Sequence, residues 1–283
     1  MIYLPILGAV ALAGGTVFER EILRKKSIDI KKYQTAGFLA ISLIMLPLLF
    51  FFWRVDSPAL QLKNMLIFVA VIIISIIANL LTFYSVKGEK INNLEPAKML
   101  EPLFTILLAL LFSLFFRELY ESNTKVIIPA LIAGFALIAS HIEKEHLKIN
   151  KYFLAAIMGS LFFGLEIVTS RLILHFYSPV TFYFIRCAII FLISLLIFRP
   201  KLQEINKRAK RNILMIGIIW VIYRVIAYYG YVRIGVISTT LIFMLGSVFV
   251  YMFAKIFLKE KINLRNIIAS IIILACVLYA NFA

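Results

Sequence analysis

Ten hydrophobic segments, each long enough to cross a lipid bilayer, fill almost all of this 283-residue chain. A helical crossing needs about 20 mostly apolar residues, because every backbone polar group must be hydrogen-bonded internally where no water is present. The hydrophobic content of 63% and the mean hydropathy of +0.99 lie far above the values of soluble proteins. We therefore expect an all-α integral membrane protein with ten transmembrane helices, whose first partner is the lipid bilayer.

The apolar runs and the charged breaks between them define the expected spans. These are residues 4–23, 33–53, 63–86, 92–116, 125–141, 152–174, 179–198, 211–232, 235–258 and 262–282. The longest hydrophilic stretches between the spans, residues 24–32, 141–151 and 199–211, are too short to fold as soluble domains. We therefore expect the membrane part to be the whole protein.

The sequence shows no pattern for nucleotide, metal or covalent chemistry. It has no G-x-x-x-x-G-K-[ST] loop, so we do not expect direct coupling to ATP within the chain. The two cysteines, Cys187 and Cys276, lie in apolar runs and are interpreted as small hydrophobic residues. The three histidines lie near span ends without the spacing of metal ligands. No cofactor, metal site or catalytic residue is predicted.

The positions of the basic residues explain the net charge of +16 without a nucleic-acid partner. The connectors after the first, third, fifth, seventh and ninth spans hold most of the Lys and Arg residues. Short cytoplasmic connectors collect such residues, so this set is expected in the cytoplasm and both termini on the outer face. A surface for anionic lipid or RNA at residues 199–211 is the alternative interpretation.

Two pairs of matching stretches indicate an internal repeat. Residues 8–23 align without a gap on residues 159–174, and the paired positions Arg20 and Arg171 carry more weight than the aliphatic matches. Residues 115–118 (Phe-Phe-Arg-Glu) correspond to residues 257–260 (Phe-Leu-Lys-Glu). We expect two five-helix repeats, at residues 1–141 and 151–283. An odd number of spans per repeat makes the repeats inverted, and inverted repeats indicate alternating access around a central site.

On these stretches the chain resembles the drug/metabolite transporter superfamily, specifically the ten-span EamA-type transporters. Residues 100–104 (Leu-Glu-Pro-Leu-Phe), residues 245–249 (Leu-Gly-Ser-Val-Phe), and Glu118 and Glu260 also carry the resemblance. It implies a transporter in the plasma membrane of a prokaryote, rather than an enzyme. Two features depart from the family: Ser247 replaces the second proline, and family members keep both termini in the cytoplasm, opposite to the orientation from charge.

Three charged residues fall near the middle of their spans: Glu166, Arg186 and Arg224. A charge at the centre of a membrane helix costs about 2.5 to 3.5 kcal/mol on insertion scales, so all three should face protein or water. One Glu cannot neutralise two arginines. The remaining positive charge would attract a carboxylate or phosphate of a substrate, to which Arg offers a planar double donor. The alternative is that Glu166 pairs with one arginine and only fixes helix packing.

Further candidates for substrate binding come from neighbouring positions. Trp220 and Tyr228 share a helical face with Arg224 at i−4 and i+4, and form an aromatic wall beside the cation. Lys98 and Glu101 share one face of the fourth span, although a salt-bridged helix end explains them as well. Asn79 of the third span is a weaker candidate, because polar packing between helices explains it equally well.

The expected function is a secondary-active or exchange transporter that moves a small polar metabolite, an amino acid or an organic anion, by alternating access. Glu166 is considered as the carrier of a coupling proton, although a nearby arginine tends to keep a carboxylate ionised. A proton-coupled exporter of cationic drugs is the alternative, against which the two central arginines argue. A membrane enzyme acting on lipid-linked substrates is less favoured, because the chain holds only two aspartates, Asp29 and Asp56. No pattern in the sequence indicates an oligomeric partner.

Overall fold

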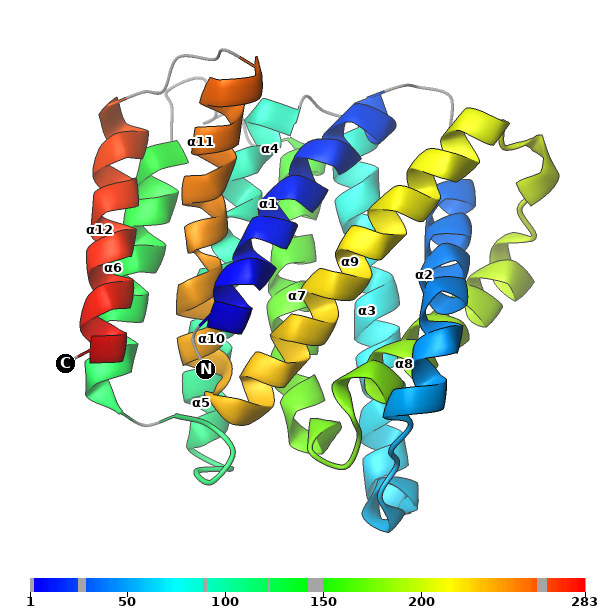
Figure 1. Cartoon of the computed structure of the whole chain (residues 1–283), viewed down its shortest axis with the longest axis horizontal. Coiled ribbons are helices and arrows are strands. Elements are labelled where there is room, and N and C mark those ends of the chain that lie inside the picture. Colours follow the sequence, from blue (N-terminus) through cyan, green and yellow to red (C-terminus); the bar gives the residue numbers. More distant parts are fainter. Residues whose placement is uncertain are drawn as a thin grey trace.

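The computed structural model describes residues 3–24, 29–88, 91–121, 123–141, 150–258 and 264–282. These residues form helices, joined by short connectors (Figure 1). The α-helices are α1 (Tyr3–Arg24), α2 (Ile30–Phe52), α3 (Leu62–Gly88), α4 (Ile91–Lys98), α5 (Leu100–Ser113), α6 (Thr124–His141), α7 (Lys151–Leu174), α8 (Pro179–Phe198), α9 (Lys207–Arg233), α10 (Val236–Phe243), α11 (Leu245–Leu258) and α12 (Leu264–Phe282). Two short 3₁₀ helices, η1 (Ser57–Leu60) and η3 (Leu202–Glu204), lie in connectors.

The apolar helices agree with the predicted spans. Within the described ranges, 6 helices are long and apolar enough to cross a membrane, and four further apolar helical stretches are shorter. The shorter stretches are Tyr3–Thr16, Thr124–Ser140, Val236–Met252 and Leu264–Ala280. The predicted all-α membrane fold is therefore confirmed.

The two halves of the chain run in opposite directions. In Figure 1, α1 runs upward and its counterpart α7 runs downward, as inverted repeats require. We call the end of the bundle at which α1, α3, α6, α8 and α11 end the basic face, because the basic connectors follow these helices. The other end, at which α2, α5, α7 and α9 end, is called the opposite face. Which face is cytoplasmic stays a prediction.

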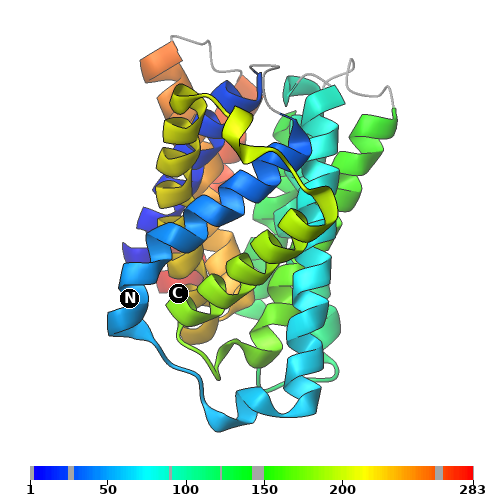
Figure 2. The ribbon, with the colours of Figure 1, turned by 90° about the vertical axis from the view of Figure 1, so that its right-hand side faces the viewer.

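Packing between the halves follows a two-fold pattern. Helix α3 packs on α7, and in the same way α9 packs on α1. Helix α2 packs on α8, as Figure 2 shows, and α6 packs on α12. Each of these pairs joins helices of different halves, so the interface between the halves runs through the whole bundle. The division into repeats at residues 1–141 and 151–283 stays a prediction.

The fourth and ninth spans are both discontinuous. The break between α4 and α5 is at Met99, because Pro102 has no N–H to donate to the carbonyl of Lys98. The break between α10 and α11 is at Met244, where no proline is involved. The Ser247 hydroxyl donates to the Met99 sulfur over 3.7 Å, so the two breaks meet where the halves join.

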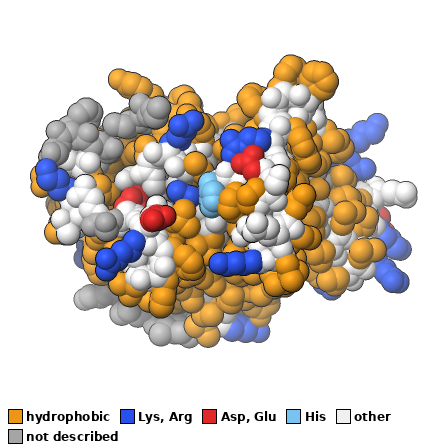
Figure 3. Space-filling model, turned by 90° about the horizontal axis from the view of Figure 1, so that it is seen from below, with side chains coloured by type: hydrophobic (Ala, Val, Ile, Leu, Met, Phe, Trp, Pro, Cys, Tyr) orange, Lys and Arg blue, Asp and Glu red, His pale blue; other side chains and the backbone are white. Residues whose placement is uncertain are grey.

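The surface of the bundle is rich in exposed apolar side chains. Phe50 is 87% exposed and Phe115 is 75% exposed, which water would disfavour and lipid would not. Seen from the opposite face, charged side chains and a histidine gather near the middle, and hydrophobic side chains surround them (Figure 3). This distribution fits a bundle surrounded by lipid.

Some residues of the predicted repeat lie outside the described part of the chain. Lys259 and Glu260 fall between the described residues 258 and 264, and the side chain of Arg20 is likewise not described.

Candidate functional site

The structure brings the three central charges together. Glu166 of α7 forms an ion pair with Arg186 of α8 through its Oε1 atom, and its Oε2 atom lies 3.5 Å from Nη1 of Arg224 in α9. The side chains are 0%, 4% and 10% exposed in that order. One buried carboxylate is therefore shared by two guanidinium groups from two other helices.

Hydroxyl groups complete the environment of Glu166. The Tyr228 hydroxyl donates to Glu166 Oε1 over 3.0 Å, and the Ser170 hydroxyl donates to the same oxygen over 3.1 Å. Tyr228 also accepts a hydrogen bond from Arg186. Buried ions are tolerated only when their charges and remaining hydrogen-bonding positions are satisfied, and this network meets that demand for Glu166. Arg186 is held on two sides, whereas Arg224 contacts Glu166 only at the longer distance.

Aromatic rings surround both cations. The Arg186 guanidinium carbon lies 5.1 Å from the ring centroid of Tyr183. The corresponding distances from Arg224 are 5.5 Å to Tyr223 and 5.8 Å to Phe163. Rings at these distances stabilise a cation through their negative faces.

A cavity of about 400 Å³ lies beside this cluster, within the range of small-molecule sites. Its lining comes from both halves, and the two breaks at Met99 and Met244 contribute to it. Six of the predicted site residues line it: Asn79, Lys98, Glu101, Arg186, Trp220 and Arg224. Glu166 and Tyr228 are not lining residues. They lie behind the wall and position the two arginines.

The cavity extends toward the basic face. Tyr33 and Gln34 line it from the first turn of α2, and Asn266 lines it from the first turn of α12. All three positions lie at the end of the bundle where the basic connectors are. Toward the opposite face, the lining includes Tyr183, Tyr231 and Thr240, which are 2%, 1% and 6% exposed.

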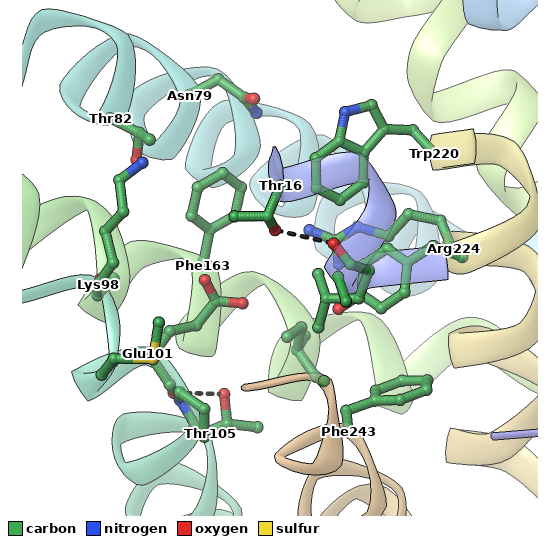
Figure 4. A pocket seen from close by; sticks show the side chains of 18 of the residues that line it. Thr16, Asn79, Thr82, Lys98, Glu101, Thr105, Phe163, Trp220, Arg224 and Phe243 are labelled. Atoms are coloured by element: carbon green, nitrogen blue, oxygen red, sulfur yellow. Dashed lines mark hydrogen bonds between the residues drawn. The ribbon is translucent and has the colours of Figure 1, made fainter. Parts of the chain in front are cut away.

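Two charges of opposite sign face each other across the cavity. Figure 4 shows the Glu101 carboxylate and the Arg224 guanidinium pointing into the same space, while Lys98 extends toward Thr82. Within the described residues, no hydrogen bond or ion pair joins the Glu101 carboxylate to another side chain; the bond from Thr105 goes to its backbone carbonyl, over 2.9 Å. The cavity wall therefore presents both an anionic and a cationic side chain to a bound molecule.

Several polar lining residues were not predicted from the sequence. Gln34 is 1% exposed and donates to the Ser194 hydroxyl over 3.1 Å, and Thr16, Tyr251 and Asn266 also line the cavity. Gln34 and Asn266 lie near span ends, where polar residues are expected on any membrane helix, so no pattern distinguishes them. Asn79, which was predicted, donates to the Ser75 carbonyl over 2.7 Å.

An all-helical membrane bundle, with halves that run in opposite directions around a cavity that holds a few charged side chains, fits the architecture of a membrane transporter. Residues 150–282 match the EamA-like transporter family. This match over the second half of the chain confirms the resemblance to the EamA-type drug/metabolite transporters.

The fold is also shared with solved structures. One crystal structure of a protein is similar with a TM-score of 0.73 and 12% sequence identity, over 99% of this chain and 96% of that chain. A likeness at this identity concerns the fold alone. No curated protein matches the sequence.

Proposed function

We propose that this transporter carries a small metabolite with a carboxylate group, and that it works by secondary-active transport or exchange. The observation that carries the proposal is Arg224, a guanidinium on the cavity wall that shares one carboxylate with Arg186. The two arginines share the Glu166 carboxylate, and the carboxylate in the cavity wall, Glu101, forms no ion pair with Arg224 in the described part of the chain. A substrate carboxylate would supply a further anion to Arg224 through a charge-assisted, two-pronged hydrogen bond.

The wall opposite Arg224 favours one of the two substrate classes that the sequence left open, amino acids and organic anions. Glu101 faces the cavity without an ion partner among the described residues, and it would attract an ammonium group. A simple organic anion would gain nothing from this carboxylate and would be repelled by it. An amino acid satisfies both walls, since its carboxylate would meet Arg224 and its ammonium would meet Glu101. Trp220 and Phe243 offer apolar surface to its side chain.

Movement of the substrate follows from the two-fold architecture. The cavity extends toward the basic face and is lined by both halves, and we infer that the described conformation is the one that opens toward that face. Exchange of the conformations of the two halves would open the opposite face around the same central charges. The helix breaks at Met99 and Met244 lie in the cavity wall, so a bound substrate would contact the points at which the two spans could bend.

A proton-coupled exporter of cationic drugs is the second candidate. It is favoured by the Glu101 carboxylate, which forms no ion pair within the described residues. In that function Glu101 would bind the cation, Trp220 and Tyr223 would stack on it, and Glu101 would carry the proton in exchange. Glu166 is less suited to a proton-carrying role, because two guanidinium groups and two hydroxyl groups already occupy its carboxylate.

Exchange assays in proteoliposomes separate the two candidates. Liposomes loaded with one unlabelled compound would be tested against labelled amino acids, monocarboxylates, dicarboxylates and lipophilic cations, with and without a pH gradient. Amino-acid exchange without a pH gradient supports the proposal. Transport confined to cations and driven by the pH gradient would contradict it and favour the exporter.

A further inference from the structure

A connector of the first half is attached to a helix of the second half at the opposite face. Glu121, between α5 and α6, accepts a hydrogen bond from the Ser238 amide at Oε1 over 2.8 Å, and one from the Ile237 amide at Oε2 over 3.1 Å. These amides belong to the first turn of α10, and a helix leaves its first N–H groups without partners inside the helix. The carboxylate thus caps α10 and complements the positive end of its dipole.

The backbone before α10 is shaped to admit this carboxylate. Gly235 has φ of +94°, a conformation that favours glycine. A Cβ atom at this position would lie 2.1 Å from Oε1 of Glu121. Glycine is therefore required both by the turn and by the close approach of the carboxylate.

A second partner for Glu121 lies nearby on α7. Arg171 has two buried guanidinium nitrogens, Nε and Nη1, without a hydrogen-bond partner in the described part of the chain. It attracts Glu121 electrostatically without a direct ion pair in this conformation. The Tyr120 hydroxyl donates to the Val168 carbonyl over 2.7 Å and so holds the connector against α7, close to Arg171.

We propose that Glu121 is a gate residue with two alternative partners: it caps α10 while the opposite face is closed, and it pairs with Arg171 when that face opens. Opening of this face requires α10 to move away from the α5–α6 connector, which breaks both hydrogen bonds of the cap. The buried nitrogens of Arg171 then provide a new partner for the released carboxylate. A transporter opens its site to one face or the other by switching between two discrete arrangements of similar stability.

The inference rests on the alternating access proposed above, but not on the substrate. Its test therefore uses substrate-free protein. Val236 is fully buried in the first turn of α10. In full-length protein without native cysteines, reconstituted in lipid nanodiscs, a Val236→Cys thiol would react with a water-soluble maleimide only when α10 moves. The reaction rate then reports the open fraction, even where that fraction is small.

Arg171→Gln removes the partner of the open state and leaves both hydrogen bonds of the α10 cap in place. It should lower the labelling rate at Val236→Cys at least threefold when Glu121 is present, and should have no effect when combined with Glu121→Ala. Glu118→Gln, an exposed carboxylate of the same connector, is the matched control and should leave the rate unchanged. A parallel variant keeps the native Cys187, which is fully buried in α8, in place of the Val236→Cys thiol. Labelling of Cys187 would report unfolding.

Two results would overturn the proposal. One is an unchanged rate in Arg171→Gln, and the other is a decrease of the same size in the Glu121→Ala background. Neither result depends on amino-acid exchange by the unmodified protein, which is measured separately. Failure of the gate proposal and failure of the proposed transport function can therefore be distinguished.

Discussion

Arg224 Nη1 lies 3.5 Å from Oε2 of Glu166, while Oε1 of the same carboxylate is paired with Arg186. The two arginines therefore have different roles. Arg186 is fixed by Glu166 and Tyr228, and it completes a structural network in the wall. Arg224 is the less restrained cation and lines the cavity. A substrate carboxylate would therefore bind more favourably to Arg224 than to Arg186.

Replacement of the shared carboxylate should destabilise the bundle. Glu166→Gln leaves two buried guanidinium groups without an anion, and breaking a buried ion pair in this way costs about 3 to 5 kcal/mol. Thermal unfolding in detergent would measure the loss. Ser170→Ala, which removes one neutral donor to the same carboxylate, is the matched control and should cost only about 0.5 to 1.5 kcal/mol. Equal stability of Glu166→Gln and the unmodified protein would show that the network is not stabilising.

Glu101→Gln should change the selectivity of transport and leave the fold intact, because no ion pair within the described residues depends on this carboxylate. Exchange of amino acids should fall about 10- to 100-fold, the effect of one lost charge-assisted contact. Monocarboxylates without an ammonium group should be transported no worse, or better. An equal decrease for both substrate classes would indicate that Glu101 supports the folded protein and does not bind the ammonium group of the substrate. Glu118→Gln controls for the general effect of removing one carboxylate.

Gly235→Ala should destabilise the closed form of the opposite face. The substitution places a Cβ atom against Glu121 and strains a residue at φ of +94°, which together cost about 1 to 3 kcal/mol. The melting temperature should decrease. Gly14→Ala in α1 is the control, because its Cβ would meet nothing within 4 Å and alanine favours the helix. Similar melting temperatures for the two variants would argue against the close approach at Gly235.

The hydrophobic pattern predicts the spans well, because a membrane helix must satisfy its own backbone and cover itself with apolar side chains. The meeting of Glu166 with Arg186 and Arg224 follows from the same physics, since charges inside a bilayer seek each other or water. The pattern does not predict which residues face the cavity. Trp220 and Tyr228 share one helical face, yet of these two only Trp220 lines the cavity. Neighbouring helices bury Tyr228 completely and leave Trp220 at the cavity wall.

The attachment of Glu121 to α10 left no sequence signal. Glu121 and Ile237 are separated by 116 positions, and neither stands out in its own segment. The break at Met99 follows from Pro102, whereas the break at Met244 has no proline to predict it. These features arise from the packing of one half on the other, which a single sequence does not describe.

The role of Arg224 is tested most directly by amino-acid exchange in proteoliposomes, measured for the unmodified protein, Arg224→Lys and Arg224→Gln. Arg233→Gln, an exposed arginine at the end of the same helix, is the control. Arg224→Gln should lower the exchange rate at least about 10-fold, and Arg224→Lys should retain part of it, because Lys keeps the charge without the planar double donor. Unchanged exchange by folded Arg224→Gln would contradict the assignment of Arg224 as the carboxylate-binding residue.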